Sequence, residues 1–235
     1  MLVQGAASHR PNCLRRVAPG GALVLAILLV FTGCILPQPA QHLVTAAYRP
    51  QNVFVCGSSL PPQVRRVAVF PMACDQDTTE MVYGRDALEP ILRVELAKLR
   101  RFELISIGPE MLQARTGQAS WSCEDALPHD LFSWLGESCG CDAVLFCRLT
   151  TFRGYAPLAV GWRMRLVDVR THNTLWASDE VFDAGEPAVQ AGARHFQLAN
   201  RRNCEPVPDE WVIGNSPRQF GQYAAARLLA TLPGL

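Results

Sequence analysis

The chain has 235 residues, of which 49% are hydrophobic, and this suits one globular domain with extensions. Its formal net charge is +1, and residues 1–33 hold three arginines and no acidic residue, so the remainder carries 19 basic and 21 acidic side chains. The chain has no run of lysine and arginine, which excludes a phosphate-backbone footprint, and we expect no nucleic-acid partner.

The first 33 residues have the plan of a secretory signal, with an arginine-bearing start, an apolar stretch and small residues at the end. The stretch from Gly20 to Gly33 has about 14 residues, whereas a helix that crosses a bilayer needs roughly 20. We therefore predict a signal peptide over 1–33. A short uncleaved membrane anchor is the alternative.

Phe31, Thr32, Gly33 and Cys34 resemble the lipobox of bacterial lipoproteins, in which a bulky apolar residue and two small residues precede an obligatory cysteine. The resemblance implies cleavage after Gly33 and a covalent diacylglycerol and N-acyl lipid on Cys34; we expect no other cofactor. Two or three acyl chains make a durable membrane anchor, since one chain holds only marginally. Ile35 stands where Asp is the usual inner-membrane retention residue, which favours the periplasmic face of the bacterial outer membrane.

Residues 34–61 contain several prolines, glutamines and serines without clear periodicity, and they are predicted to form a flexible tether. A globular domain is predicted over 62–235. Its strands are expected at 64–72, 102–107 and 141–152, with a hairpin over 162–182. Its helices are expected at 86–99, 109–117, 127–140, 186–202 and 216–232.

Two of these helices have predicted starts. Asp86 is a plausible N-cap, which would place Pro90 near the end of the first turn. Ser216 as N-cap, followed by Pro217 at the first helical position, is a stronger signal.

The predicted order of elements is β-α-β-α-α-β-β-β-α-α. A helix between the first two strands favours a crossover and a partly parallel sheet, while the late hairpin makes the sheet mixed. The sequence therefore predicts an α/β (α+β) domain with a single mixed β-sheet and helices packed on it.

Seven cysteines remain if Cys13 leaves with the signal and Cys34 is lipidated, and an odd number leaves at least one unpaired. Cys141 and Cys147 flank an apolar run and are expected to be small buried residues. Cys139 and Cys141 lack the further ligands of a zinc site, so we expect no metal. The cysteines in loop-like settings are the expected disulfide partners, with the pairing left open: Cys56, Cys74, Cys123 and Cys204.

No nucleotide-binding, zinc-protease or serine-hydrolase motif is present. The histidines of the predicted domain, His129, His172 and His195, are far apart in the sequence and are expected at the surface or at element ends. Asp168 ends a strand beside a turn, a position typical of hydrogen bonds from side chain to backbone. We predict that the protein is not an enzyme, and an envelope hydrolase or transferase with a cryptic site is the second alternative.

Two motifs carry a resemblance to a known group of proteins. The stretch Cys141-Asp142-Ala143-Val144-Leu145 resembles a "gaDavl" strand, and Leu166-Val167-Asp168-Val169-Arg170-Thr171 up to Leu175-Trp176 resembles a "vrlvDvrtGevlWs" hairpin. Both occur in small envelope lipoproteins: the curli-secretion lipoprotein, the penicillin-binding-protein activator lipoprotein and the N-terminal domain of the Tol translocation protein. The resemblance covers about residues 64–182 and implies architecture more than activity. His172-Asn173 replaces the turn glycine of the pattern.

The resemblance and the lipobox lead us to expect a lipid-anchored, periplasm-facing accessory or scaffold protein that docks onto a cell-envelope complex, such as an assembly or peptidoglycan-synthesis factor. An oligomeric secretion or pore component of the outer membrane is the alternative, although the extra alternating strands of the curli-secretion pore are missing. The expected partners are the membrane, through the lipid, and an envelope protein. The candidate partner contacts are Gly154, Tyr155, Ala156, Pro157, Trp121 and Trp211.

Overall fold

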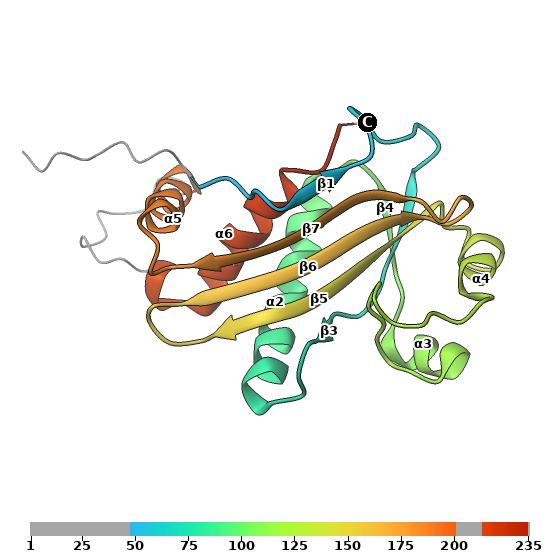
Figure 1. Ribbon diagram of the computed structural model, residues 1–235, viewed down its shortest axis with the longest axis horizontal. Helices are drawn as coiled ribbons and strands as arrows, with labels where there is room; N and C mark the ends of the chain where they lie inside the picture. The colour runs from blue at the N-terminus through green and yellow to red at the C-terminus, as the bar shows by residue number, and fades with distance from the viewer. Residues whose placement is uncertain (1–47, 201–212, 235) are drawn as a thin grey trace, which may run out of the picture. The chain divides into compact units, whose positions relative to one another are not determined.

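The computed structural model describes residues 48–200 and 213–234, which build a mixed β-sheet with helices packed on it (Figure 1). The strands are β1 (Val53–Val55), β2 (Arg66–Val69), β3 (Ala73–Cys74), β4 (Glu103–Ser106), β5 (Ala143–Arg153), β6 (Ala159–Asp168) and β7 (Thr174–Asp183). The helices are α2 (Thr79–Lys98), α3 (Pro109–Thr116), α4 (Leu131–Glu137), α5 (Pro187–Asn200), α6 (Pro217–Leu229) and the short 3-10 helix η1 (Ile213–Asn215).

The strands follow the order β1-β7-β6-β5-β2-β4, and β3 pairs beside β5. β5, β6 and β7 form an antiparallel meander, whereas β2 lies parallel to both β4 and β5. α2 makes the crossover between β2 and β4 that the sequence predicts. The predicted fold class and the mixed sheet are therefore confirmed.

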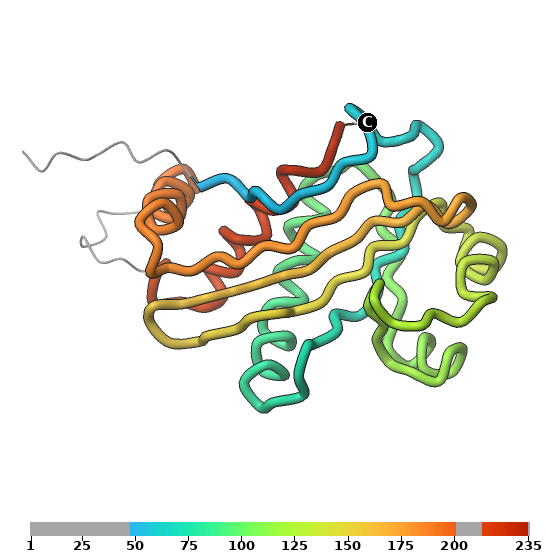
Figure 2. The backbone as a smooth tube through the Cα atoms, in the orientation of Figure 1, coloured from blue at the N-terminus to red at the C-terminus, as the bar shows by residue number. Residues whose placement is uncertain are grey.

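One face of the sheet is packed against helices along its length. Alternation along β6 sends Trp162, Met164 and Leu166 to this face, where all three are buried. The same cluster contains Leu88 of α2 and Phe220 of α6, and both helices lie behind the meander in Figures 1 and 2. This cluster is the main hydrophobic core.

The opposite face is packed at one end only. There Phe70 and Phe146 meet edge to face, with ring centroids 5.2 Å apart, and they join Leu112 of α3 and Leu135 of α4 in a second core. Over the other end of the meander, Figures 1 and 2 show no described helix in front of the strands. Helices therefore cover only part of this face in the described residues.

The predicted boundary between tether and domain is wrong. Residues 48–61, which the sequence placed within the tether of 34–61, belong to the folded unit, since β1 pairs antiparallel with β7. The N–H of Leu60 donates to the carbonyl of Gly234 at 2.7 Å, and the Leu60 side chain is buried. Pairing with a strand more than 100 residues away leaves no local pattern in the sequence.

Helix α2 begins seven residues before Asp86, the N-cap that the sequence predicts. The hydroxyl of Thr78 accepts a hydrogen bond from the N–H of Met81, so Thr78 is the N-cap. Pro90 therefore lies inside the helix, where its ring removes one N–H from the backbone ladder. The predicted cap of α6 is confirmed, because the Ser216 hydroxyl accepts from the N–H of Gln219.

The aspartates of the two recognised motifs hold backbone in place. The carboxylate of Asp142 accepts from the N–H groups of Arg65 and Arg66, at 3.1 and 3.0 Å, where β2 begins beside β5. The carboxylate of Asp168 accepts from two N–H groups of the turn between β6 and β7, as its position at the end of a strand predicts. The aspartates of both motifs thus have a structural role, since they fix the backbone where strands begin or turn.

Replacing Asp142 by Ala is expected to lower the free energy of unfolding by about 2 kcal/mol, because two backbone N–H groups lose a charged acceptor. Urea denaturation followed by circular dichroism measures the change. Asp86→Ala is the matched control: Asp86 is largely exposed and pairs with the neighbouring Arg85, so its loss is expected to cost less than about 0.5 kcal/mol. Equal effects of the two substitutions would contradict the role given to Asp142.

Candidate functional site

Three charged side chains stand next to one another on the open part of the sheet. The register places Arg148 of β5 opposite Arg163 of β6, and Arg163 opposite Asp179 of β7. Because side chains alternate between faces along a strand, these three lie on the face opposite Trp162 and Met164. Directly opposed side chains on neighbouring strands have Cβ atoms about 5 Å apart, so the sheet itself sets their spacing.

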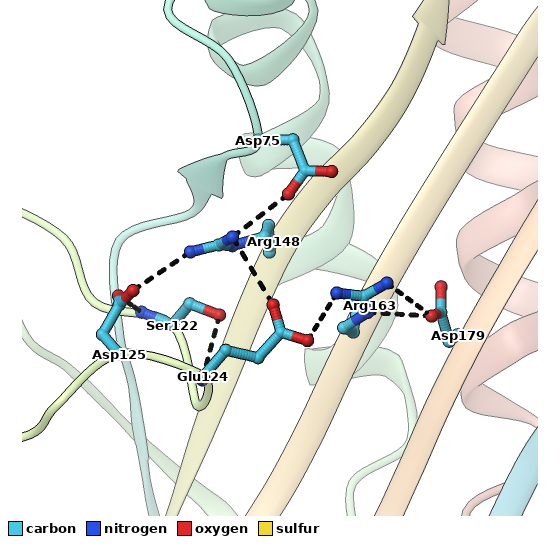
Figure 3. A network of polar contacts seen from close by, with 7 residues as sticks. All are labelled: Asp75, Ser122, Glu124, Asp125, Arg148, Arg163 and Asp179. Carbon is cyan, nitrogen blue, oxygen red and sulfur yellow. Dashed lines mark hydrogen bonds and ion pairs between the residues drawn. The ribbon is translucent and has the colours of Figure 1, made fainter.

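Arg148 forms ion pairs with carboxylates from two loops. Its guanidinium contacts Asp75 at 3.1 Å, Asp125 at 3.2 Å and Glu124 at 3.5 Å (Figure 3). Asp125 is oriented in turn by the backbone N–H of Ser122, which donates to its carboxylate at 2.6 Å. The loop over 122–125 is thereby fastened to the sheet by charge.

Arg163 continues the chain of ion pairs across the meander. It contacts the second oxygen of Glu124 and, at 2.8 Å, the carboxylate of Asp179 (Figure 3). The hydrogen bond to Asp179 is the main cause that raises the pKa of Arg163, so this guanidinium stays charged. With Asp75 and Asp125 included, four carboxylates share two guanidinium groups.

A hollow of about 360 Å³ opens beside this network. Arg165 on β6 lies opposite Ala177 of β7, and Ala177 lies opposite Phe54 of β1. Among the residues that the structure describes, the Arg165 guanidinium has no hydrogen-bond or ion-pair partner, and Phe54 is 53% exposed. The hollow is lined by Asn52, Phe54, Cys123, Glu124, Arg163, Met164, Arg165, Ala177, Ser178 and Asp179.

The chemistry of this arrangement is that of recognition. A guanidinium keeps its proton in proteins and offers fixed donors to carboxylates or phosphates, so it binds anions rather than transferring protons. Within residues 48–200 and 213–234, no group of three or more His, Cys, Asp or Glu side chains could hold a metal ion. Arg165, which has no partner among the described residues, could bind an acidic group. The exposed ring of Phe54 beside Ala177 could contact an apolar group next to that acid.

None of the predicted contact residues that the structure describes lines this hollow. Tyr155 is 67% exposed and Pro157 is exposed, in the connection between β5 and β6. Trp121 was expected as an exposed contact, and this is corrected: it is 6% exposed in the second core, and its indole N–H donates to the Thr116 hydroxyl. Trp211 lies outside the described residues.

The hollow was not found from sequence, although β6 gave one signal. Arg163 and Arg165 alternate with Trp162, Met164 and Leu166, which showed that two arginines share one face. Their partners come from loops and strands that are distant in the chain, and no local pattern marks them.

The described cysteines do not form disulfides. Cys56, Cys74 and Cys123, expected disulfide partners, are free, and Cys204 lies outside the described residues. Cys141 and Cys147 are buried as predicted. Burial raises the pKa of the Cys141 thiol to about 11 and also raises that of Cys147. These buried thiols are therefore poor nucleophiles at neutral pH.

The histidines take no part in the network. His129 and His195 are exposed, as expected. His172 is also exposed and adopts a left-handed backbone with φ of 60° in the turn between β6 and β7, where the recognised pattern has glycine. Its ring stacks on Phe132 at a centroid distance of 4.4 Å, a contact that offsets the cost of this conformation.

The predicted lipobox, with Gly33 and Cys34, and the predicted signal peptide lie outside the described residues. Among the helices that the structure describes, none is both long enough and apolar enough to cross a membrane. The membrane attachment predicted at Cys34 therefore stays a prediction.

No family model matches the sequence, and no curated protein matches it significantly. Solved structures similar to this chain include lipoprotein GNA1162 from Neisseria meningitidis, with 18% identity, a TM-score of 0.41 and coverage of 58% of this chain and 99% of the other. The PelC dodecamer from Paraburkholderia phytofirmans has 13% identity, a TM-score of 0.37 and coverage of 78% and 98%. The LpoB C-terminal domain from Salmonella enterica has 17% identity, a TM-score of 0.34 and coverage of 55% and 87%.

Replacing Arg148 by Met is expected to destabilise the domain by about 2 kcal/mol, because three carboxylates lose the largely buried cation that they share. The loss should shrink when Asp125 is also changed to Asn, and a double-mutant cycle in urea denaturation measures that coupling. Arg85→Met, which removes one surface pair, is the control and is expected to cost less than about 0.5 kcal/mol. Additive effects of the Arg148 and Asp125 substitutions would show that the network is not coupled.

Proposed function

We propose that this chain is a lipid-anchored, non-enzymatic protein on the periplasmic face of the bacterial outer membrane, where it docks onto a protein complex of the envelope. The observation that carries the proposal is the sheet face left open over β6 and β7, with its hollow and an arginine that has no partner among the described residues. The lipobox-like sequence from Phe31 to Cys34 supports the anchor.

The charge arrangement of the open face suits docking better than catalysis. Arg148 and Arg163 are already neutralised by carboxylates of the same chain, and they hold the loop over 122–125 against the sheet. Arg165 keeps its charge available within the hollow, beside the exposed ring of Phe54. A rigid sheet that presents an aromatic side chain and an arginine has the composition of a protein interface.

Charge complementarity defines the partner group. An acidic side chain that enters the hollow would pair with Arg165, and an apolar side chain beside it would cover Phe54. The partner of this proposal is therefore a protein segment that carries Asp or Glu next to an apolar residue.

The anchor is tested by labelling growing cells with radioactive palmitate. The wild-type chain is expected to carry label and to fractionate with the outer membrane, because the acylated Cys34 holds it there. Cys34→Ser is expected to carry no label and to leave the membrane fraction. Cys56→Ser is the matched control, since Cys56 is an exposed thiol outside the lipobox, and its label should be unchanged. Label that persists in Cys34→Ser would refute the lipobox.

Docking is tested by crosslinking in intact cells followed by mass spectrometry of the captured proteins. Arg165→Glu is expected to reduce capture of one defined envelope protein at least about tenfold, equivalent to 1.4 kcal/mol, because like charges would meet in the hollow. Arg170→Glu makes the same charge change in the turn between β6 and β7 and should leave that capture intact. Equal capture by both variants would contradict the proposed surface. Capture of copies of this chain alone would point to the oligomeric alternative.

A further inference from the structure

The described chain begins at the same end of the sheet as the connection between β5 and β6. The ring of Tyr48 lies edge-on to Phe182, at a centroid distance of 5.2 Å, and its hydroxyl donates to Glu180. The next residue of β7, Asp183, pairs with Ala159 at the start of β6. In Figure 1 the first described residues and the β5–β6 connection lie at one end of the meander, with α3 and α4 at the other.

This end carries exposed aromatic side chains, and the connection over 154–157 itself contains no charged residue. Residues 154–157 are Gly, Tyr, Ala and Pro, and Tyr155 is 67% exposed. Tyr83 of α2 is 64% exposed, and its ring lies 6.2 Å from that of Phe152, which nearly adjoins the connection. At the base of the connection Arg153 contacts both carboxylate oxygens of Asp183 at 2.9 Å, so these two charges neutralise each other.

Covalent geometry limits how far this end can lie from a lipid on Cys34. Thirteen residues lie between Cys34 and Tyr48, and the 14 steps from one Cα to the next span at most about 50 Å when the chain is fully extended. A surface held this close to the membrane samples it at high effective concentration, so a contact too weak to bind a free domain suffices for a tethered one.

We propose that the connection over 154–157, together with Tyr83, rests on the lipid headgroup surface when the protein is anchored. Tyrosine is enriched at membrane interfaces, because its ring is apolar and its hydroxyl stays hydrated. The neutral Arg153–Asp183 pair avoids the cost of bringing an isolated charge to that surface. The inference rests on the proposed lipid anchor, and it assigns these residues to lipid rather than to the envelope protein partner.

The test uses the full-length lipidated protein in proteoliposomes, with the photoreactive residue p-benzoylphenylalanine in place of Tyr155. Irradiation is expected to give a covalent lipid adduct, with equal yield in phosphatidylcholine vesicles and in vesicles that also contain phosphatidylglycerol, because the contact is uncharged. The same residue in place of Tyr83 should also give an adduct. In place of Met111, which is 53% exposed on α3 at the opposite end, it should give a yield several-fold lower.

Intact mass of the same samples reports acylation of Cys34 and separates the two proposals. Acylated protein with no adduct at position 155 or 83, or with equal adduct at position 111, overturns the membrane contact and leaves the anchor standing. If the lipid adduct forms only in vesicles that contain the anionic lipid phosphatidylglycerol, the contact depends on charge, and the proposal of an uncharged contact is wrong. Unacylated protein refutes the anchor and the membrane contact together. A protein adduct at position 155 in cells, without lipid adduct, assigns the connection to a protein partner instead.

Discussion

The structure depends on a mismatch of length between the central strands and the helices on one side of them. The strands β5, β6 and β7 have 10 or 11 residues, so each extends for about 34 Å. α3 and α4 have eight and seven residues and are about 12 Å long, so they cover one end of the face on which they pack. α2, with 20 residues, is about 30 Å long and joins α6 on the other face. One end of this sheet face is therefore left without a helix because α3 and α4 are much shorter than β5, β6 and β7.

The exposed part of this face is stabilised by charge instead of by a helix. An uncovered apolar sheet would invite aggregation, and arginines beside carboxylates keep the face soluble while their alkyl stems cover the strands. Glu124 is central, because it joins Arg148 to Arg163 and so links neighbouring strands through a loop. Arg165 differs from Arg148 and Arg163, since no described carboxylate neutralises it, and this difference is the reason that the proposed docking surface is centred on Arg165.

Much of the fold could be predicted from local patterns of apolar residues, turns and caps, and the two motif aspartates add a further local signal. Asp142 and Asp168 accept hydrogen bonds from the backbone close to strand ends, so in this chain they mark the β2–β5 junction and the β6–β7 turn. β1 and the start of α2 could not be predicted in the same way. β1 is defined by pairing with β7, and α2 extends past Asp86 because Met81 has a core to pack into. The hollow likewise depends on contacts between residues far apart in the sequence, such as Arg163 with Glu124, 39 positions away, and Phe54 with Ala177 on the paired strand.

The two proposed surfaces are compatible because they lie on different parts of the same strands. The aromatic connection over 154–157 is at one end of the meander, while the hollow with Arg165 and Phe54 is on its open face. If the connection lies at the lipid surface, the strands lead away from the membrane, and the open face points sideways into the periplasm. The hollow lies along β6 between the membrane-facing end and the cover formed by α3 and α4. A partner could then reach it without displacing any described helix, and the anchor would restrict its approach to the plane above the membrane.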